Sequence, residues 1–145
     1  MPIDPSDRAA WPNLRDEDFV EISEETSEYN CIAHAAGFSN SWWWPIQGYY
    51  WPSGVPKEQT LDAFRIAYAT LGYQLSADGR LQPGIEKIAI YVNANAQPTH
   101  AARQLEDGRW TSKLGGLIDI EHTDIGCLEG GDYGTVGMFL ERARA

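Results

Sequence analysis

The dipeptide Asp107-Gly108 constrains the fold of this chain most strongly, because it lies between two segments of strand-like composition. Asp-Gly is a strong signal for a two-residue β-hairpin turn. Residues 99–105 and 109–113 are therefore predicted to pair as antiparallel strands. Two further segments, 87–92 and 118–120, are rich in β-branched residues and predict neighbouring strands. The second half of the chain is thus expected to form an antiparallel sheet.

Two helices are predicted before these strands. Asn30 is a favourable N-cap, the run that begins at Cys31 is rich in alanine, and Gly37 suits the position just after a helix. A second helix is predicted over residues 57–71, where apolar residues recur on one face. Helices followed by antiparallel strands predict the α+β class.

Length and composition predict one domain with a conventional core. A chain of 145 residues can bury about two-thirds of the surface it exposes when unfolded. Hydrophobic residues make up 43% of the chain and charged residues 22%, which excludes disorder of the whole chain. A single domain is expected over residues 1–145, with a polar N-terminal arm at residues 1–15.

The charge balance narrows the expected partners. Lys and Arg total 11 against 21 Asp and Glu, so the formal net charge is −10. This sign disfavours nucleic acids and anionic membranes and leaves a basic protein as a possible partner. The longest apolar stretches, such as residues 88–92, are far short of a membrane span, and the N-terminus shows no export signal. A cytoplasmic location is expected, with export by a non-classical route left open.

The two cysteines are too few for a disulfide framework and are expected as reduced thiols. One of them, Cys31, is predicted at a helix N-terminus, where free backbone amides favour the thiolate. The alternative is that Cys31 is a small buried apolar residue. His100, at the start of a separate strand, is the better candidate for a general base. His34 is expected to be structural, and the sequence leaves the role of His122 open.

A third residue is needed to orient such a base. With Asp107 and Gly108 as the turn residues, Gly115 lies opposite His100 and Ser112 points to the other face. Asp119 follows shortly and is the candidate that returns toward the imidazole. The alternative for Asp119 is a turn carboxylate in solvent.

Further residues are candidates for binding. The backbone amide of Cys31 would hold an oxyanion, with Asn30 or Gln97 as a second donor and Ser112 in support. Asn30 is equally well explained as a helix cap. The aromatic loop, residues 42–51, is predicted either to wall a substrate groove or to pack on the core. Its groove candidates are Trp43, Trp44, Tyr50 and Trp51.

Neither a metal site nor a cofactor site is expected. A metal site built from Cys31, His34, Asp119 and His122 lacks a recognisable ligand spacing. The glycines at residues 126–134 lack the spacing of a phosphate-binding loop.

The order of these motifs resembles a known superfamily. A Tyr-Asn-Cys triplet ending at Cys31 opens a helix, a β-branched strand follows at 87–91, His100 opens the next strand, and a hairpin ends at 110–115. Over about residues 29–119 this resembles the papain-like cysteine hydrolases of the NlpC type. The resemblance implies a papain-like α+β domain with N-terminal helices packed on an antiparallel sheet. It implies Cys31 as the nucleophile and His100 as the base. Residues 29–134 also resemble a bacterial family without an established substrate.

Together these features predict a thiol hydrolase or amidase that uses a Cys-His dyad or triad and a thioester intermediate. The substrate would be an amide bond of a peptide, a peptidoglycan stem peptide or a side-chain amide. The alternative is a non-catalytic acidic protein of papain-like fold that binds a basic protein partner.

Overall fold

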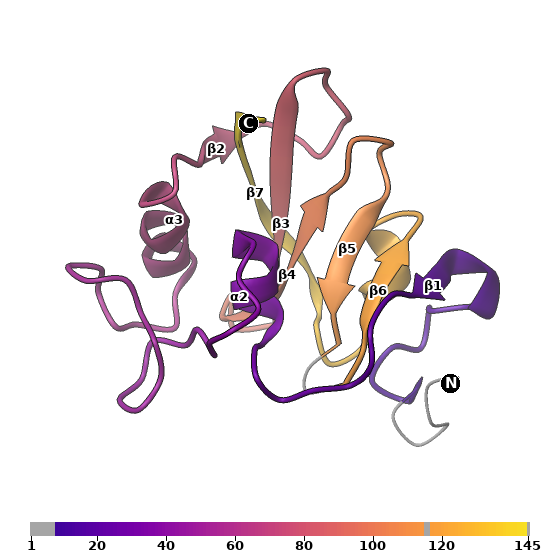
Figure 1. The fold of residues 1–145 in the computed structure, drawn as a ribbon, viewed down its shortest axis with the longest axis horizontal. Coiled ribbons are helices and arrows are strands. Elements are labelled where there is room, and N and C mark those ends of the chain that lie inside the picture. The colour runs from indigo at the N-terminus through magenta and orange to yellow at the C-terminus, as the bar shows by residue number, and fades with distance from the viewer. Residues whose placement is uncertain (1–7, 115–116, 145) are drawn as a thin grey trace.

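The protein is built on one seven-stranded antiparallel sheet (Figure 1). A computed structural model gives its structure and describes residues 8–114 and 117–144. The strands lie side by side in the order β1-β6-β5-β4-β3-β7-β2, so the three-residue strands β1 and β2 form the edges. The strands are β1 (Phe19–Glu21), β2 (Gln74–Ser76), β3 (Ile85–Val92), β4 (Pro98–Gln104), β5 (Trp110–Lys113), β6 (Asp119–His122) and β7 (Thr135–Ala143).

The helix at Cys31 is confirmed, and both of its predicted ends are present. Helix α2 (Cys31–Ala36) begins after Asn30, whose side-chain oxygen accepts a hydrogen bond from the Ala33 amide at 3.1 Å. It ends at Gly37, whose φ of 93° lies in the left-handed region that favours glycine. These two residues fix the length of α2 at six residues.

The second helix is shorter than predicted. Helix α3 (Leu61–Ala69) begins after Thr60, whose hydroxyl accepts a hydrogen bond from the Ala63 amide at 3.1 Å. The threonine cap therefore starts the helix four residues later than position 57. Two short 3-10 helices, η1 (Asp16–Asp18) and η2 (Gly126–Leu128), complete the named elements.

The predicted fold class, an α+β papain-like domain with N-terminal helices packed on an antiparallel sheet, is wrong. The structure is mostly antiparallel sheet, and its first strand, β1, precedes α2 in the chain. The long strand β7 pairs with β3 along eight positions, from Ile85–Ala143 to Val92–Thr135. Since the sequence analysis predicts no strand at 135–143, it underestimates the sheet and overestimates the share of the helices.

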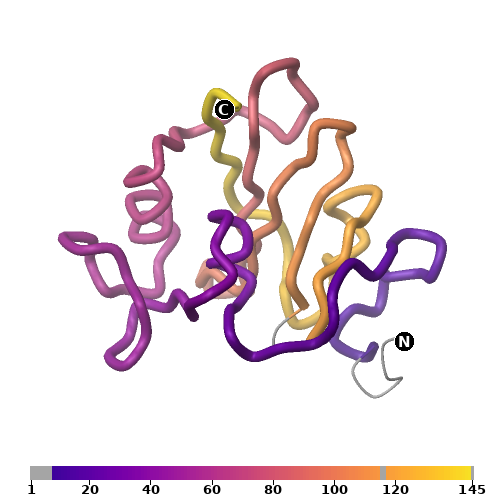
Figure 2. Tube along the Cα trace, viewed as in Figure 1, coloured from indigo at the N-terminus to yellow at the C-terminus, as the bar shows by residue number. Residues whose placement is uncertain are grey.

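Each face of the sheet carries its own hydrophobic cluster. Helices α2 and α3 pack on one face, the helix face, together with Ile88, Ile90 and Ala101. Figure 2 shows the chain between the two helices extending to one side of the sheet. The opposite face, the rear face, is covered by η2 and by Trp11 and Leu14 of the N-terminal arm. The arm thus adds buried apolar residues to the core, while its residues 1–7 lie outside the described residues.

The hairpin between β4 and β5 is confirmed, but its register is shifted by one residue. The Leu105 amide donates to the Arg109 carbonyl at 2.7 Å, and Arg103 pairs with Thr111. Three residues, 106–108, therefore form the loop, which ends at Gly108 with φ of 93°. A three-residue hairpin with a left-handed glycine in its last position is the next most common solution after the two-residue turn.

This shift reverses the predicted faces. Thr111 shares the helix face with Arg103, and Ser112 shares the rear face with His100. The predicted partner of His100, Gly115, lies outside the described residues.

Candidate thiol site and aromatic cleft

An open cleft of about 360 Å³ lies at the start of α2. Asn30, Cys31, Thr99 and Tyr133 line it together with residues of the aromatic loop. Cys31 therefore lies in the lining of a cavity large enough for a small ligand or a long side chain.

The aromatic loop contributes different residues to the cleft from those predicted. Trp44 lines the cleft as expected. The remaining lining residues of this loop are Trp42, Ile46 and Tyr49, which the sequence analysis did not single out. Exposure alone does not distinguish these residues, since Ile46 and Tyr49 are 41% and 47% exposed and Tyr50, which does not line the cleft, is 50% exposed.

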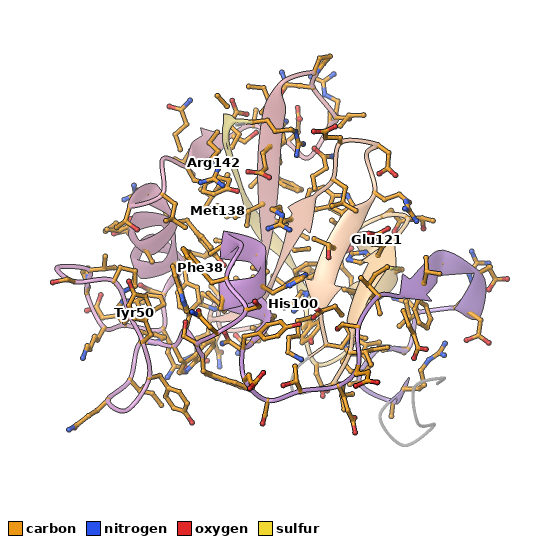
Figure 3. The ribbon with its side chains drawn as sticks, viewed as in Figure 1. Phe38, Tyr50, His100, Glu121, Met138 and Arg142 are labelled. Atoms are coloured by element: carbon orange, nitrogen blue, oxygen red, sulfur yellow. The ribbon has the colours of Figure 1, made fainter. Side chains whose placement is uncertain are left out.

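The other three groove candidates have different surroundings. Trp43 is buried, and its backbone amide donates to the Asn30 side-chain oxygen at 3.0 Å. The ring of Tyr50 lies 5.0 Å from that of Trp43, on the exposed part of the loop (Figure 3). Trp51 is buried against Phe64, with its indole nitrogen donating to a backbone carbonyl. Trp43 and Trp51 are therefore core residues, because the loop folds back on itself.

The thiol of Cys31 is less acidic than its place at a helix start suggests. Only 7% of the residue is exposed, and burial raises the pKa of the thiol to about 11. Hydrogen bonds from the backbone amides of Ala101 and Ile32 and the charge of Lys113 act in the opposite direction on this pKa. Desolvation thus outweighs the helix start, and the thiol is protonated at neutral pH.

His100 lies on the rear face, whereas Cys31 is on the helix face. The ring of His100 stacks on Tyr133, with centroids 4.0 Å apart and an interplanar angle of 10°. Its cross-strand neighbour Tyr91 contacts it on the same face, while the next residue, Ala101, packs against α2. Because side chains alternate along a strand, the sheet separates the imidazole from the thiol. The structure therefore does not bring the predicted dyad together.

His100 instead belongs to a buried chain of hydrogen bonds. Its Nε2 lies 3.0 Å from the Ser112 hydroxyl, which lies 2.8 Å from Nε2 of His122. Nδ1 of His122 lies 2.8 Å from the Asp124 carbonyl, which can only accept, so this nitrogen carries the proton. Ser112 then donates to His122 and accepts from His100. All three side chains are fully buried.

Burial keeps both imidazoles neutral at about pH 7. Burial lowers the pKa of His122 to about 4 and holds the pKa of His100 well below 6.5. Nδ1 of His100 is buried and has no hydrogen-bond partner in the described part of the chain. We therefore assign the hydrogen-bonded chain His100–Ser112–His122 to the rear core. This also gives a role to His122, which the sequence had left open.

Asp119 lies on the helix face and not beside His100. It pairs with Lys113 across β5 and β6 and accepts a hydrogen bond from the Tyr29 hydroxyl. Nδ1 of His34 lies 3.9 Å from its other carboxylate oxygen. Asp119 is buried, so the alternative of a solvent-exposed turn carboxylate also fails.

Lys113 lies with Asp119 and His34 on the helix face, and these three residues form the charged cluster. The sequence analysis did not single out Lys113. Its side chain is fully buried, and Nζ donates to the Leu117 carbonyl at 2.7 Å. The same atom lies 4.8 Å from the centroid of the Tyr29 ring, a cation–π contact. Burial lowers the pKa of Lys113, while the charges of Asp119 and Cys31 raise it. With the correct hairpin register, Lys113 would have been placed on the helix face.

The two remaining candidates serve local structure. Asn30 caps α2 and also donates to the Trp43 carbonyl at 2.7 Å, which ties the aromatic loop to the helix. Gln97 is exposed in the β3–β4 turn, where it accepts a hydrogen bond from Asn93 at 3.1 Å. It is not among the residues that line the cleft.

Two negative findings concern residues 8–114 and 117–144. No group of three or more His, Cys, Asp or Glu side chains there is arranged to hold a metal ion. None of the helices in these ranges has the length and hydrophobicity needed to cross a bilayer.

Comparison with known proteins gives a family but no activity. A family model described as a domain of unknown function (DUF7689) matches residues 21–141. This range includes the residues that line the cleft and the His100–Ser112–His122 chain. No curated protein and no solved structure matches the chain.

Proposed function

The chain belongs to the DUF7689 family, and we propose that it is a thiol-dependent hydrolase of amide bonds with Cys31 as the nucleophile. The observation that carries this proposal is the position of Cys31, at the start of α2, in the lining of the aromatic cleft. The substrate classes are those expected from the sequence: a peptide, a peptidoglycan stem peptide or a side-chain amide. The two free thiols fit a reducing compartment such as the cytoplasm.

The reaction needs a proton acceptor for the thiol, and Lys113 supports this role better than His100. Lys113 is on the helix face, and its charge and that of Cys31 act on each other's pKa. Burial lowers the pKa of Lys113, which makes its neutral amine more available to accept a proton. His100 is on the other side of the sheet and acts on stability.

The chemical steps then balance as follows. The Cys31 proton passes to the neutral Lys113 amine as sulfur bonds to the amide carbon. The C–N bond breaks, and the same proton leaves with the amine. Water hydrolyses the resulting thioester to a carboxylic acid and restores the thiol. Backbone amides at the start of α2, such as that of Ile32, supply donors for the negative oxygen.

One observation favours the second candidate, a non-catalytic binding protein. A thiol with a pKa of about 11 is only slightly ionised at neutral pH, as for a packing residue. The cleft would then bind a ligand without reaction.

Acylation by p-nitrophenyl acetate separates the two candidates. A nucleophilic Cys31 releases nitrophenolate and keeps an acetyl group, which mass spectrometry locates on a Cys31 peptide. Cys127 is the internal control, since burial raises the pKa of its thiol to about 12. The proposal predicts faster acetylation of Cys31 than of Cys127 and no burst of nitrophenolate in Cys31→Ser. Equal acetylation of both cysteines, or none at Cys31, favours the binding protein.

A further inference from the structure

The aromatic cleft has an unusual lining for an acidic protein, because none of its eight residues is charged. Four of them have aromatic rings. The ring centroids of two of these, Trp42 and Tyr49, lie 6.3 Å apart, and the ring planes are inclined by 39°. Trp44 and Tyr133 are the other two. Aromatic faces that surround a small space attract organic cations through their quadrupoles.

Two of the four aromatic residues are held by contacts outside the cleft. Trp44 packs edge-on against the buried Phe64, with centroids 5.5 Å apart. Tyr133, whose ring belongs to the rear-face cluster, is held by its stack on His100. These contacts fix the inner part of the cleft without a ligand, which lowers the entropic cost of binding.

Exposed carboxylates lie next to the cleft in the chain. Glu28 is two residues before the lining residue Asn30, and Asp132 directly precedes Tyr133. Glu24 and Glu25 are exposed in the same segment, between β1 and α2. With a net charge of −10, these carboxylates favour a cation near the cleft and disfavour an anion.

We propose that the aromatic cleft binds the cationic side chain of a lysine or arginine residue in a polypeptide. The cleft volume of about 360 Å³ accepts one such side chain and part of its backbone. The alkyl stem packs against the rings, the cation interacts with their faces, and the carboxylates act on the flanking backbone at longer range. That the reacting amide belongs to this polypeptide rests on the proposed function, whereas the binding preference does not.

Tryptophan fluorescence tests this preference in Cys31→Ser, which excludes turnover. The probes are three blocked pentapeptides of glycine with a central lysine, norleucine or glutamate. The lysine peptide is expected to bind roughly tenfold more tightly than the norleucine peptide, and more tightly at low salt. The glutamate peptide is expected to bind least.

Two substitutions in the same loop provide a matched comparison. Trp42→Leu removes a cleft ring and is expected to abolish most of the lysine preference. Tyr50→Leu removes an exposed ring that does not line the cleft and is expected to leave it unchanged. Glu28→Gln with Asp132→Asn is expected to reduce the salt dependence without altering the aromatic lining.

The outcomes distinguish this inference from the proposed hydrolase. Equal affinity for the lysine and norleucine peptides, or no binding of either, overturns the cationic preference. If the lysine peptide is preferred while Cys31 resists acetylation, the binding preference is retained and the hydrolase fails. If Cys31 is acetylated without a lysine preference, the hydrolase is supported and this inference fails.

Discussion

Lowering the pH from about 7 to about 5 should destabilise the protein through the two imidazoles of the rear core. In the folded state Ser112 joins His100 and His122, and the Asp124 carbonyl fixes the tautomer of His122. In the unfolded state both imidazoles titrate near 6.5. Burial lowers the folded pKa of His122 to about 4 and that of His100 well below 6.5. Below 6.5 the unfolded state therefore binds more protons, and stability falls as the pH falls.

The size of the effect follows from the two pKa values of His122. The loss begins near the unfolded value of 6.5 and stops growing near the folded value of about 4. At about pH 5 it amounts to about 2 kcal/mol for His122. His100 acts in the same direction, because burial lowers its folded pKa as well, so the total exceeds the contribution of His122 alone and is a sizeable part of the roughly 5–15 kcal/mol typical of a domain. The pKa of His34 is also lowered, so His34 acts in the same direction.

Urea unfolding followed by tryptophan fluorescence, at a series of pH values between about 5 and 8, measures this loss. Carboxylates do not obscure it, because the shifted ones, such as Asp78 and Asp107, have lowered pKa values and titrate at lower pH. The slope of the unfolding free energy against pH gives the number of protons bound on unfolding. The difference should be close to zero at about pH 8 and rise toward about two protons at about pH 5, from the two rear-core histidines.

His122→Gln removes one titrating group and should reduce that number by about one. If this variant does not fold, NMR titration of wild-type His122 gives the same information, since its ring signals should not shift above about pH 5. Equal stability at both ends of the pH range, or an unchanged slope in His122→Gln, would refute the assignment of neutral buried imidazoles.

Three further predictions concern packing and the charged cluster. Ser112→Ala leaves two buried ring nitrogens unpaired and should cost about 2–3 kcal/mol in urea unfolding; stability equal to the wild type would show that the serine is dispensable. Gly134→Ala should cost more than Gly54→Ala, because both glycines have positive φ but the added Cβ at Gly134 would overlap the Val92 carbonyl oxygen, whereas at Gly54 it meets open space; equal melting temperatures would contradict this. Lys113→Met should slow acetylation of Cys31 about tenfold and move its pH dependence upward, and Lys113→Arg should not restore the rate, because the guanidinium stays protonated and cannot accept the thiol proton; an unchanged pH profile would exclude Lys113 from the reaction.

The local elements were predictable where one or two residues determine them. Asn30 and Gly37 define both ends of α2, and the β-branched composition of 87–92 predicts β3. Strand β7 was not predictable in this way, because Gly137 and charged residues interrupt its pattern. It is stabilised by pairing with β3, which depends on tertiary structure.

The site was less predictable than these elements, because small local differences decide it. Residues 106–108 suit either a two-residue or a three-residue hairpin loop, and that one-residue difference determines which face Ser112 and Lys113 occupy. The aromatic loop has no regular period, so the sequence does not indicate which rings point into the cleft. The position of Cys31 at the start of α2 was predictable, because it depends on the helix cap alone.

The two hydrogen bonds between Asn30 and the backbone of Trp43 couple the start of α2 to the wall of the cleft. If the backbone at Trp43 moved outward, both hydrogen bonds would break. Asn30 would then lose the contacts that align its side chain as the cap of α2, the helix that carries Cys31. Tyr49, which is 47% exposed, lies farther along the loop and lacks such a tether to the helix among the described contacts. The cleft should therefore adapt to ligands of different size by moving its outer rim, while the distance between Cys31 and the inner wall stays constant.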